Sequence, residues 1–411
     1  MLSVTIASFL SLMFFFKIFL AYVCCTKFKK NKKMKALKIG DLTVRLPIIQ
    51  GGMGVGVSLS GLASAVANQG GVGVISAVGI GMNYKSKGKY SKKANSDGFR
   101  EEIRKARKLS PNGVLGANIM LAVTDFDDLF KVALEEKLDI VFVGAGLFLK
   151  IPSTLTKEEF LHSEMKIVPK ISSARAAELT LKVWAEKFGR LPDALVIEGA
   201  KAGGHLGFKK KDLGKDAKPL NEIIKETKAV LKKYEDKFLV KIPIIAGGGV
   251  YTGKDIYKTM RAGADAVKMG TKFVTTFECD ADMNFKKQYL NASNQDDIVL
   301  IDSPVGLPGR AVNNDFLKSV EKGEKKPVKC DWQCLKSCKY KEVPYCIAEA
   351  LFNAAQGDLD NGFAFAGSNA YKATKIQSVK EVFDELVFEY TKEKLIKKRK
   401  IKVRKLAVQV S

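Results

Sequence analysis

Two spacings of apolar residues alternate along the chain from residue 44 onward. Short apolar runs, typical of buried strands, lie at residues 44–50, 72–76, 114–118, 140–143, 166–170, 194–197, 242–246 and 266–269. Several of them are separated by stretches with the helical spacing of apolar residues, at 125–136, 173–187 and 220–234. Strands that alternate with amphipathic helices are typical of a parallel β-sheet.

Eight strand-like runs predict an α/β fold of the TIM (β/α)8 barrel type, whose functional site lies at the carboxyl ends of the strands. A doubly wound open sheet is the competing fold. The first run ends in Gln-Gly-Gly-Met-Gly at 50–54, without the G-x-G-x-x-G fingerprint of a dinucleotide-binding sheet. We therefore predict a barrel over residues 34–310. A mainly helical, cysteine-containing extension would follow at 311–411.

The first 33 residues have a different composition from the rest of the chain. Residues 2–25 are nearly all apolar, and a basic run follows at 27–33. About 20 apolar residues can span a bilayer, and the basic run would hold the body of the protein in the cytoplasm. One interpretation is thus a membrane anchor. The other is a misassigned start, because Met34 opens a segment that resembles the N-terminus of a complete soluble enzyme.

The chain is strongly basic, with 69 Lys and Arg against 44 Asp and Glu and a formal charge of +25. Its lysines are scattered over helical stretches without a nucleic-acid motif or an aromatic-basic stripe. This distribution favours a solvated basic surface over binding to nucleic acid. Seven cysteines without a regular disulfide framework suit a reducing cytoplasm.

One of the two histidines, His205, lies in a glycine-rich turn directly after the apolar run 194–197. The neighbouring Gly203 and Gly204 carry no side chains that would keep a planar ligand away. Because imidazole changes its charge near neutral pH, His205 is a candidate general base. The alternative is a structural histidine in an ordinary loop.

Two further glycine turns follow the seventh and eighth runs. The first contains Gly247, Gly248 and Gly249, and the second contains Gly270 and Thr271. In TIM barrels these loops commonly bind a phosphate through backbone N–H groups. The turns therefore predict a phosphate site, although a tight turn alone would also use glycine.

Four cysteines, Cys330, Cys334, Cys338 and Cys346, form a C-x3-C-x3-C-x7-C array. Their thiolates could hold an iron–sulfur cluster or zinc. Alternatively, they are reduced thiols on a buried helix face. Beyond the array we expect a helix and loop over the site, from residues 353–357 to 367–371, and a lysine-rich surface helix at 392–405.

Four motifs in this order resemble one known family. They are the segment 47–54 (P-I-I-Q-G-G-M-G), the E-G-x-x-A-G-G-H-x-G segment at 198–207, the A-G-G-G turn at 246–249 and the G-A-D-A-V-x-M-G-T run at 263–271. Together they resemble the nitronate monooxygenases, formerly called 2-nitropropane dioxygenases. This family of FMN-binding barrels is similar to the FMN-dependent enoyl-acyl-carrier-protein reductases.

The resemblance implies a role for each matching residue. Gln50, Gly51, Gly52 and Met53 would lie along the isoalloxazine ring of FMN, and Asn118 and Lys170 would make polar contacts to it. Gly203, Gly204 and Gly247 would line the cofactor, while Gly248, Gly249, Gly270 and Thr271 would hold its phosphate. His205 matches the catalytic histidine. Lys201 stands where the family often has glutamate, which changes the expected substrate charge preference.

The implied activity is FMN-dependent oxidation of alkyl nitronates by O2. The alternatives are NAD(P)H-dependent reduction of an enoyl thioester and a non-catalytic flavin redox module. The expected partner is thus a small molecule, a nitronate or an enoyl thioester. Membrane association would involve only residues 2–25, and the sequence indicates no oligomeric state.

Overall fold

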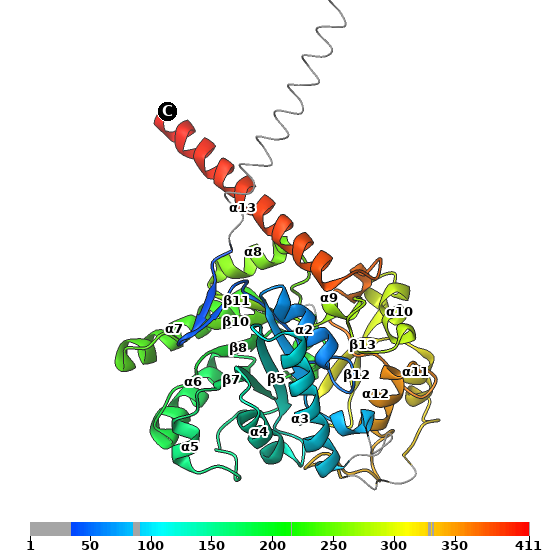
Figure 1. Cartoon of the computed structure of the whole chain (residues 1–411). Helices are drawn as coiled ribbons and strands as arrows, with labels where there is room; N and C mark the ends of the chain where they lie inside the picture. The colour runs from blue at the N-terminus through cyan, green and yellow to red at the C-terminus, as the bar shows by residue number, and fades with distance from the viewer. Residues whose placement is uncertain (1–33, 85–90, 215, 328–329, 331–332, 411) are drawn as a thin grey trace, which may run out of the picture.

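The computed structural model describes residues 34–84, 91–214, 216–327, 330 and 333–410. Eight parallel strands close into a barrel at the centre of the molecule, in the order β10-β11-β3-β4-β5-β6-β7-β8 (Figure 1). Their bounds are β3 (Ile48–Gln50), β4 (Val72–Ser76), β5 (Val114–Met120), β6 (Ile140–Gly144), β7 (Lys166–Ile171), β8 (Leu195–Glu198), β10 (Ile244–Gly247) and β11 (Ala266–Met269). Each of the eight predicted runs overlaps one of these strands, which confirms the TIM barrel.

The first predicted run is split in the structure. Its first residue, Val44, belongs to a separate antiparallel hairpin formed by β1 (Leu37–Ile39) and β2 (Leu42–Val44), and the barrel strand begins only at Ile48, directly after Pro47. The hairpin packs its buried Leu37 and Ile39 against the barrel interior. It therefore covers the amino-terminal end of the barrel, which leaves the carboxyl end for the site.

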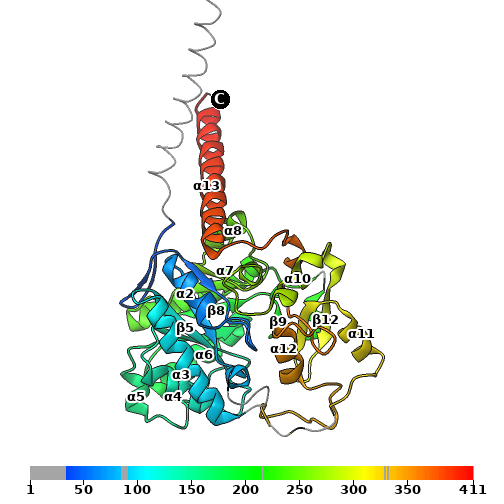
Figure 2. The ribbon, with the colours of Figure 1, turned by 45° about the vertical axis from the view of Figure 1, so that its right-hand side comes forward.

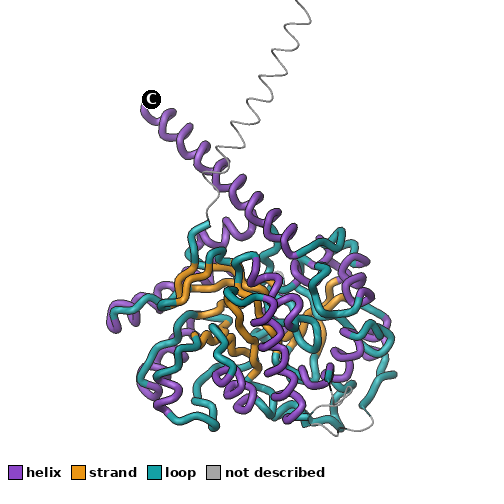
Figure 3. The backbone as a smooth tube through the Cα atoms, viewed as in Figure 1, coloured by secondary structure: helices purple, strands orange, loops and turns teal. Residues whose placement is uncertain are grey.

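Helices surround the strands, as Figure 3 shows in purple around the orange barrel. The helices around the barrel are α2 (Ser60–Asn68), α3 (Lys92–Leu109), α4 (Phe126–Glu135), α5 (Lys157–Leu161), α6 (Ala174–Val183), α7 (Leu220–Phe238), α8 (Gly253–Ala262) and α9 (Thr271–Val274). Helices α4, α6 and α7 confirm the three predicted amphipathic stretches. Short 3-10 or π turns occur at Ile80–Asn83, Trp184–Phe188, Lys210–Leu213, Gln295–Asp297 and Ala370–Lys372.

A small second sheet accompanies the barrel and was not predicted. Strands β12 (Ile298–Asp302) and β13 (Pro308–Val312) form an antiparallel pair, and β13 also pairs with β9 (Gly204–His205). Figure 2 shows β9 and β12 beside helices α11 (Asp315–Glu321) and α12 (Ile347–Ala355). The predicted boundary at residue 310 falls inside β13, and the division into barrel and extension stays a prediction.

Two more helices complete the C-terminal part, α10 (Met283–Asn291) and α13 (Val379–Val410). The expected lysine-rich helix at 392–405 is the outer part of α13, which runs away from the body (Figure 1). Its first turns are anchored by the buried residues Val382, Phe383 and Leu386. Within the described residues, no helix has the length and apolar character needed to cross a membrane. The predicted anchor in residues 1–33 lies outside them.

Candidate functional site

A large cavity of about 1290 Å³ opens at the carboxyl ends of the barrel strands. This volume exceeds the usual size of a site for one drug-sized ligand, so a cofactor and a substrate can share it. Nearly all the predicted barrel site residues line it: Gly51, Gly52, Met53, Asn118, Lys170, Gly203, Gly204, His205, Gly247, Gly248, Gly249, Gly270 and Thr271. The fold thus brings the four motifs of the sequence to one place.

Gln50 is the exception, because its side chain does not line the cavity. The residue is fully buried, and its Oε1 accepts a hydrogen bond of 2.8 Å from the backbone N–H of Val74. Its amide nitrogen donates to the carbonyl of Gly51. These bonds tie β3 to β4 and hold the Gln50 side chain outside the cavity lining, and its contact with the flavin ring stays a prediction.

The glycine turns bring backbone segments unusually close together. A Cβ on Gly51 would lie 3.1 Å from the Cα of Gly270, which follows the neighbouring strand β11. Gly248 has a φ of +100°, and a Cβ there would lie 2.7 Å from the carbonyl oxygen of Gly199. Only glycine fits both the close approach and the positive φ. The cradle below the cavity therefore depends on these residues being glycine.

The predicted loop over the site is present at residues 365–369. Its Gly367 donates a backbone hydrogen bond of 2.9 Å to Thr271 Oγ1, and Asn369 Nδ2 donates one of 2.7 Å to the carbonyl of Gly249. The loop is thus fastened to both of the predicted phosphate turns. Helix α12 supplies the predicted helix before it.

His205 lies in β9, where it pairs with Gly309 of β13. Its Nε2 lies 2.7 Å from Ser303 Oγ, and the ring of Phe365 contacts it edge-on at 4.9 Å between centroids. Burial lowers the pKa of His205 to about 4, and the positive charge of Lys170 adds to this effect. The imidazole is therefore neutral at pH 7 and able to accept a proton.

Three ionisable side chains lie inside the upper barrel. Lys170 Nζ pairs with Glu198 Oε1 at 2.9 Å across β7 and β8. The third, Lys268 on β11, was not singled out from the sequence, although it belongs to the motif at 263–271. The sequence did offer a signal for Lys268, because an ionisable residue within an otherwise apolar strand of that motif is unusual. Ser303 offered none, because only the fold brings it to His205.

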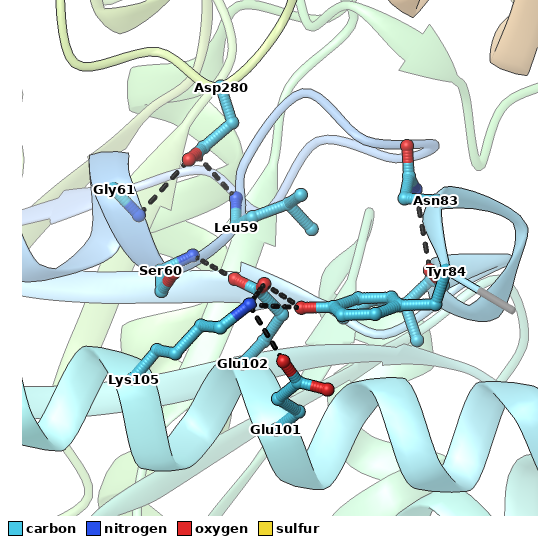
Figure 4. Close-up of polar contacts among 10 residues, drawn as sticks. Leu59, Ser60, Gly61, Asn83, Tyr84, Glu101, Glu102, Lys105 and Asp280 are labelled. Atoms are coloured by element: carbon cyan, nitrogen blue, oxygen red, sulfur yellow. Dashed lines mark hydrogen bonds and ion pairs between the residues drawn. The ribbon is translucent and has the colours of Figure 1, made fainter.

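The loop between β3 and α2, which lines the cavity with Gly51–Val55 and Val57, is anchored by two carboxylates (Figure 4). Asp280 accepts backbone hydrogen bonds from Leu59 at 2.7 Å, Gly61 at 3.1 Å and Leu62 at 3.2 Å. Glu102 accepts one from Ser60 at 2.6 Å, and the hydroxyl of Tyr84 donates to the same carboxylate. Acidic groups at this helix N-terminus satisfy N–H groups that lack partners within the helix.

The cysteine array adopts no helix between Cys334 and Cys338, which corrects the alternative of thiols on one helix face. The chain there extends along the loop after β5, because Thr124 donates a backbone hydrogen bond to Cys334 and Lys336 donates one to Ala122. Cys334 lines the cavity, whereas Cys330, Cys338 and Cys346 do not.

Among the described residues, which include all four of these cysteines, no three His, Cys, Asp or Glu side chains are placed to hold a metal ion. Burial raises the pKa of Cys334 to about 12. An iron–sulfur cluster or zinc at the array stays a prediction that the contacts do not support. Elemental analysis of anaerobically purified protein decides it.

A closed (β/α)8 barrel with a glycine cradle after its last two strands and a neutral histidine over its mouth is typical of flavin-dependent barrel oxidoreductases. The chain belongs to the nitronate monooxygenase family, whose profile matches residues 35–389. It is therefore an enzyme that acts on a small molecule.

Curated relatives agree with this assignment. A probable nitronate monooxygenase of Staphylococcus saprophyticus is 25% identical over 319 residues, covering 69% of this chain and 80% of the relative. One from Staphylococcus aureus strain Newman is 26% identical over 310 residues, covering 69% and 79%.

Solved structures show the same architecture. FabK from Thermotoga maritima superposes with a TM-score of 0.64 at 27% identity, covering 87% of this chain and 96% of its own. A nitroalkane oxidase from Streptomyces ansochromogenes has a TM-score of 0.64 at 20% identity, covering 85% and 97%, and shows the fold alone.

Proposed function

We propose that this enzyme binds FMN and uses O2 to oxidise alkyl nitronates to a carbonyl compound and nitrite. The observation that carries the proposal is the position of His205, a neutral imidazole in the same cavity as the two glycine turns. Family membership supports the flavin chemistry. The choice of FMN follows from the turns, which suit a terminal phosphate.

The residues of the cavity fit FMN. Gly248 and Gly249 of one turn, with Gly270 and Thr271 of the other, would hold the phosphate through backbone N–H groups. The loop Gly51–Met53, which carries no bulky side chain before Met53, would lie along the flat ring. Bound FMN would supply the electron acceptor for the oxidation.

The chain's own side chains would handle the substrate and its protons. The imidazole of His205 would take the proton from the carbon beside the nitro group of a neutral nitroalkane, through the ring nitrogen that is not in contact with Ser303. The protonated ring would then hold the resulting nitronate anion. Ser303 Oγ would fix the orientation of the imidazole through the 2.7 Å contact. Phe365, packed against the imidazole, would limit the access of water.

The alternative activity would use the same cavity in the reductive direction. Reduction of an enoyl thioester by NAD(P)H is the second candidate activity, because the motifs also resemble FMN-dependent enoyl-acyl-carrier-protein reductases. In that reaction His205 would lie near the thioester carbonyl or donate a proton. The direction of electron flow therefore has to be measured.

The test is to purify the chain anaerobically, record its absorption spectrum and supply two substrate pairs. With an alkyl nitronate and O2, we expect O2 consumption together with nitrite release, both greatly reduced in His205→Ala. Oxidation of NAD(P)H by a crotonyl thioester, without nitrite release in the first assay, would establish the reductase instead. Flavin that turns over neither pair would indicate a redox module, and an absence of flavin would overturn the proposal.

A further inference from the structure

Lys268 is a buried lysine inside the barrel whose charge is not balanced by a dedicated partner. The side chain lines the cavity, yet its Nζ makes no hydrogen bond with any residue in the described part of the chain. The Nζ atom lies over the ring of Phe142, 3.8 Å from the ring centroid. A buried ammonium group without a hydrogen bond is costly, so such a group indicates a ligand that completes the site.

The position of Phe142 shows where the lysine reaches. Lys268 stands on β11 and Phe142 on β6, and these strands are four places apart in the circle of eight, the largest separation that the barrel allows. The Lys268 side chain therefore crosses the barrel interior. The side chain extends away from Gly270 and Thr271, which form the proposed phosphate turn at the end of the same strand. A phosphate bound at that turn would therefore not contact the Lys268 amine.

The neighbouring charges leave the amine of Lys268 without a counter-charge of its own. Lys170 and Glu198 form an ion pair at 2.9 Å, so they neutralise each other. Burial, together with the charge of Lys170, holds the pKa of Lys268 well below its usual range. An electron-rich group in the cavity would restore the charge on the lysine and give Nζ a hydrogen-bond acceptor.

We propose that Lys268 binds the pyrimidine edge of the flavin ring, at N1 and the C2 carbonyl, as a cofactor-binding residue beneath the ring. This inference rests on the flavin binding of the proposed function and does not depend on nitronate being the substrate. The lysine would tighten binding of the ring. It would also favour the reduced flavin, because added electrons increase the negative charge at this edge.

The experiment compares FMN with riboflavin, which has the same ring and no phosphate. The dissociation constants of both are measured by flavin fluorescence on the flavin-free full chain, for the wild type, Lys268→Met and Lys268→Gln. Loss of a charge-assisted hydrogen bond weakens binding by about 10-fold or more. We expect this loss equally for both ligands, and a more negative midpoint potential of the bound flavin.

The matched control is Lys209→Gln, which removes an exposed lysine from the rim of the same cavity. It should leave the riboflavin affinity and the midpoint potential unchanged. A second measurement needs no substitution: the wild type should bind 1-deazariboflavin, which lacks the N1 acceptor, about 10-fold more weakly than riboflavin.

The role of Lys268 would be overturned if both Lys268 variants kept the wild-type flavin affinities and midpoint potential, and if the wild type bound riboflavin and 1-deazariboflavin equally well. FMN binding itself would then still stand. A loss confined to KM for the substrate would also overturn this role, since it would place the lysine on the substrate. If the wild type binds no flavin, both proposals fail. If Lys268 acts as expected but no nitronate is oxidised, only the proposed activity fails.

Discussion

His205 Nε2 and Ser303 Oγ lie 2.7 Å apart although 98 residues separate them in the chain. The contact exists because β9, which carries the histidine, pairs with β13, and β13 pairs with β12, which ends just before the serine. The small second sheet therefore positions the proposed catalytic group. The barrel alone would leave His205 on an unsupported loop.

Removal of the serine hydroxyl should reduce catalysis without releasing the flavin. In Ser303→Ala we expect kcat to fall about 5- to 10-fold, the scale of one positioning hydrogen bond, with FMN content unchanged. His205→Ala should lose about 100-fold or more. Steady-state kinetics and the flavin absorption of each variant measure both effects.

Two comparisons separate positioning from general damage to the fold. Ser303→Thr, which keeps the hydroxyl, should restore most of the activity. Adding Ser303→Ala to His205→Ala should cost little more, because the serine acts through the histidine. Additive losses in the double variant would mean that Ser303 acts independently of His205.

The acid limb of the pH profile should lie far below that of an ordinary histidine. Because burial and Lys170 lower the pKa of His205 to about 4, the imidazole stays neutral, and able to accept a proton, down to that pH. If His205 is the base, kcat/KM should remain constant from pH 8 to pH 5. It should fall only as the pH drops through about 4, where the imidazole becomes protonated. Stopped assays at each pH measure kcat/KM.

The other histidine provides the control. His162 is exposed, and His162→Asn should leave the profile unchanged. An acid limb near pH 6.5 that disappears in His205→Ala would show that the imidazole is solvated in the working enzyme and would contradict this prediction.

Gly248 should tolerate no side chain. A Cβ on Gly248 would clash with the backbone of Gly199. The substitution would therefore distort the turn, and phosphate binding would be lost as a consequence of that distortion. Gly248→Ala must also hold a φ of +100°, which is strained for alanine. We expect a folded protein that is purified with little FMN, measured by absorbance and circular dichroism.

Gly214→Ala is the matched control, since a Cβ at Gly214 would meet no atom of the described residues within 4 Å. This variant should keep its full flavin content. Stoichiometric FMN in Gly248→Ala would mean that the turn after β10 does not hold the phosphate.

Much of this fold was predictable because apolar runs and glycine turns are local signals. The eight strands, the turns at Gly248 and Gly270, and the position of His205 all follow from short segments that behave alike in any barrel. Gln50 shows the limit of this reasoning. The motif places it beside the ring, but hydrogen bonds to β4 hold its side chain outside the cavity lining.

Other features depend on contacts between distant segments. The approach of Ser303 to His205 requires a sheet whose strands are too short and too separated to leave a pattern. The array around Cys334 has helical spacing, but backbone pairing with the loop after β5 overrides it. The partner of Lys268 across the barrel becomes visible only when the circle of strands is closed.

Asp280 should make the stability of the fold depend on mildly acidic pH. Burial raises the pKa of its carboxyl to about 6, against the lowering effect of the backbone N–H groups that it accepts from. The folded state therefore binds more protons than the unfolded state between about pH 4 and pH 6. The stabilisation from this group is complete below pH 4 and is lost as pH rises through 6, and because the Asp280 residue is exposed, solvent screening keeps this change small.

The measurement is the free energy of unfolding by urea at pH 4, 5, 6 and 7 for the wild type, Asp280→Asn and the exposed control Asp212→Asn. Because asparagine does not titrate, Asp280→Asn should lack the part of the pH dependence that the wild type and the control share between pH 4 and 6. It should also be less stable than the wild type at pH 4, where the neutral carboxyl still caps the start of α2. Identical pH dependence in all three proteins would mean that Asp280 is solvated and ionised throughout, and that Glu102 alone anchors the loop beside the flavin site.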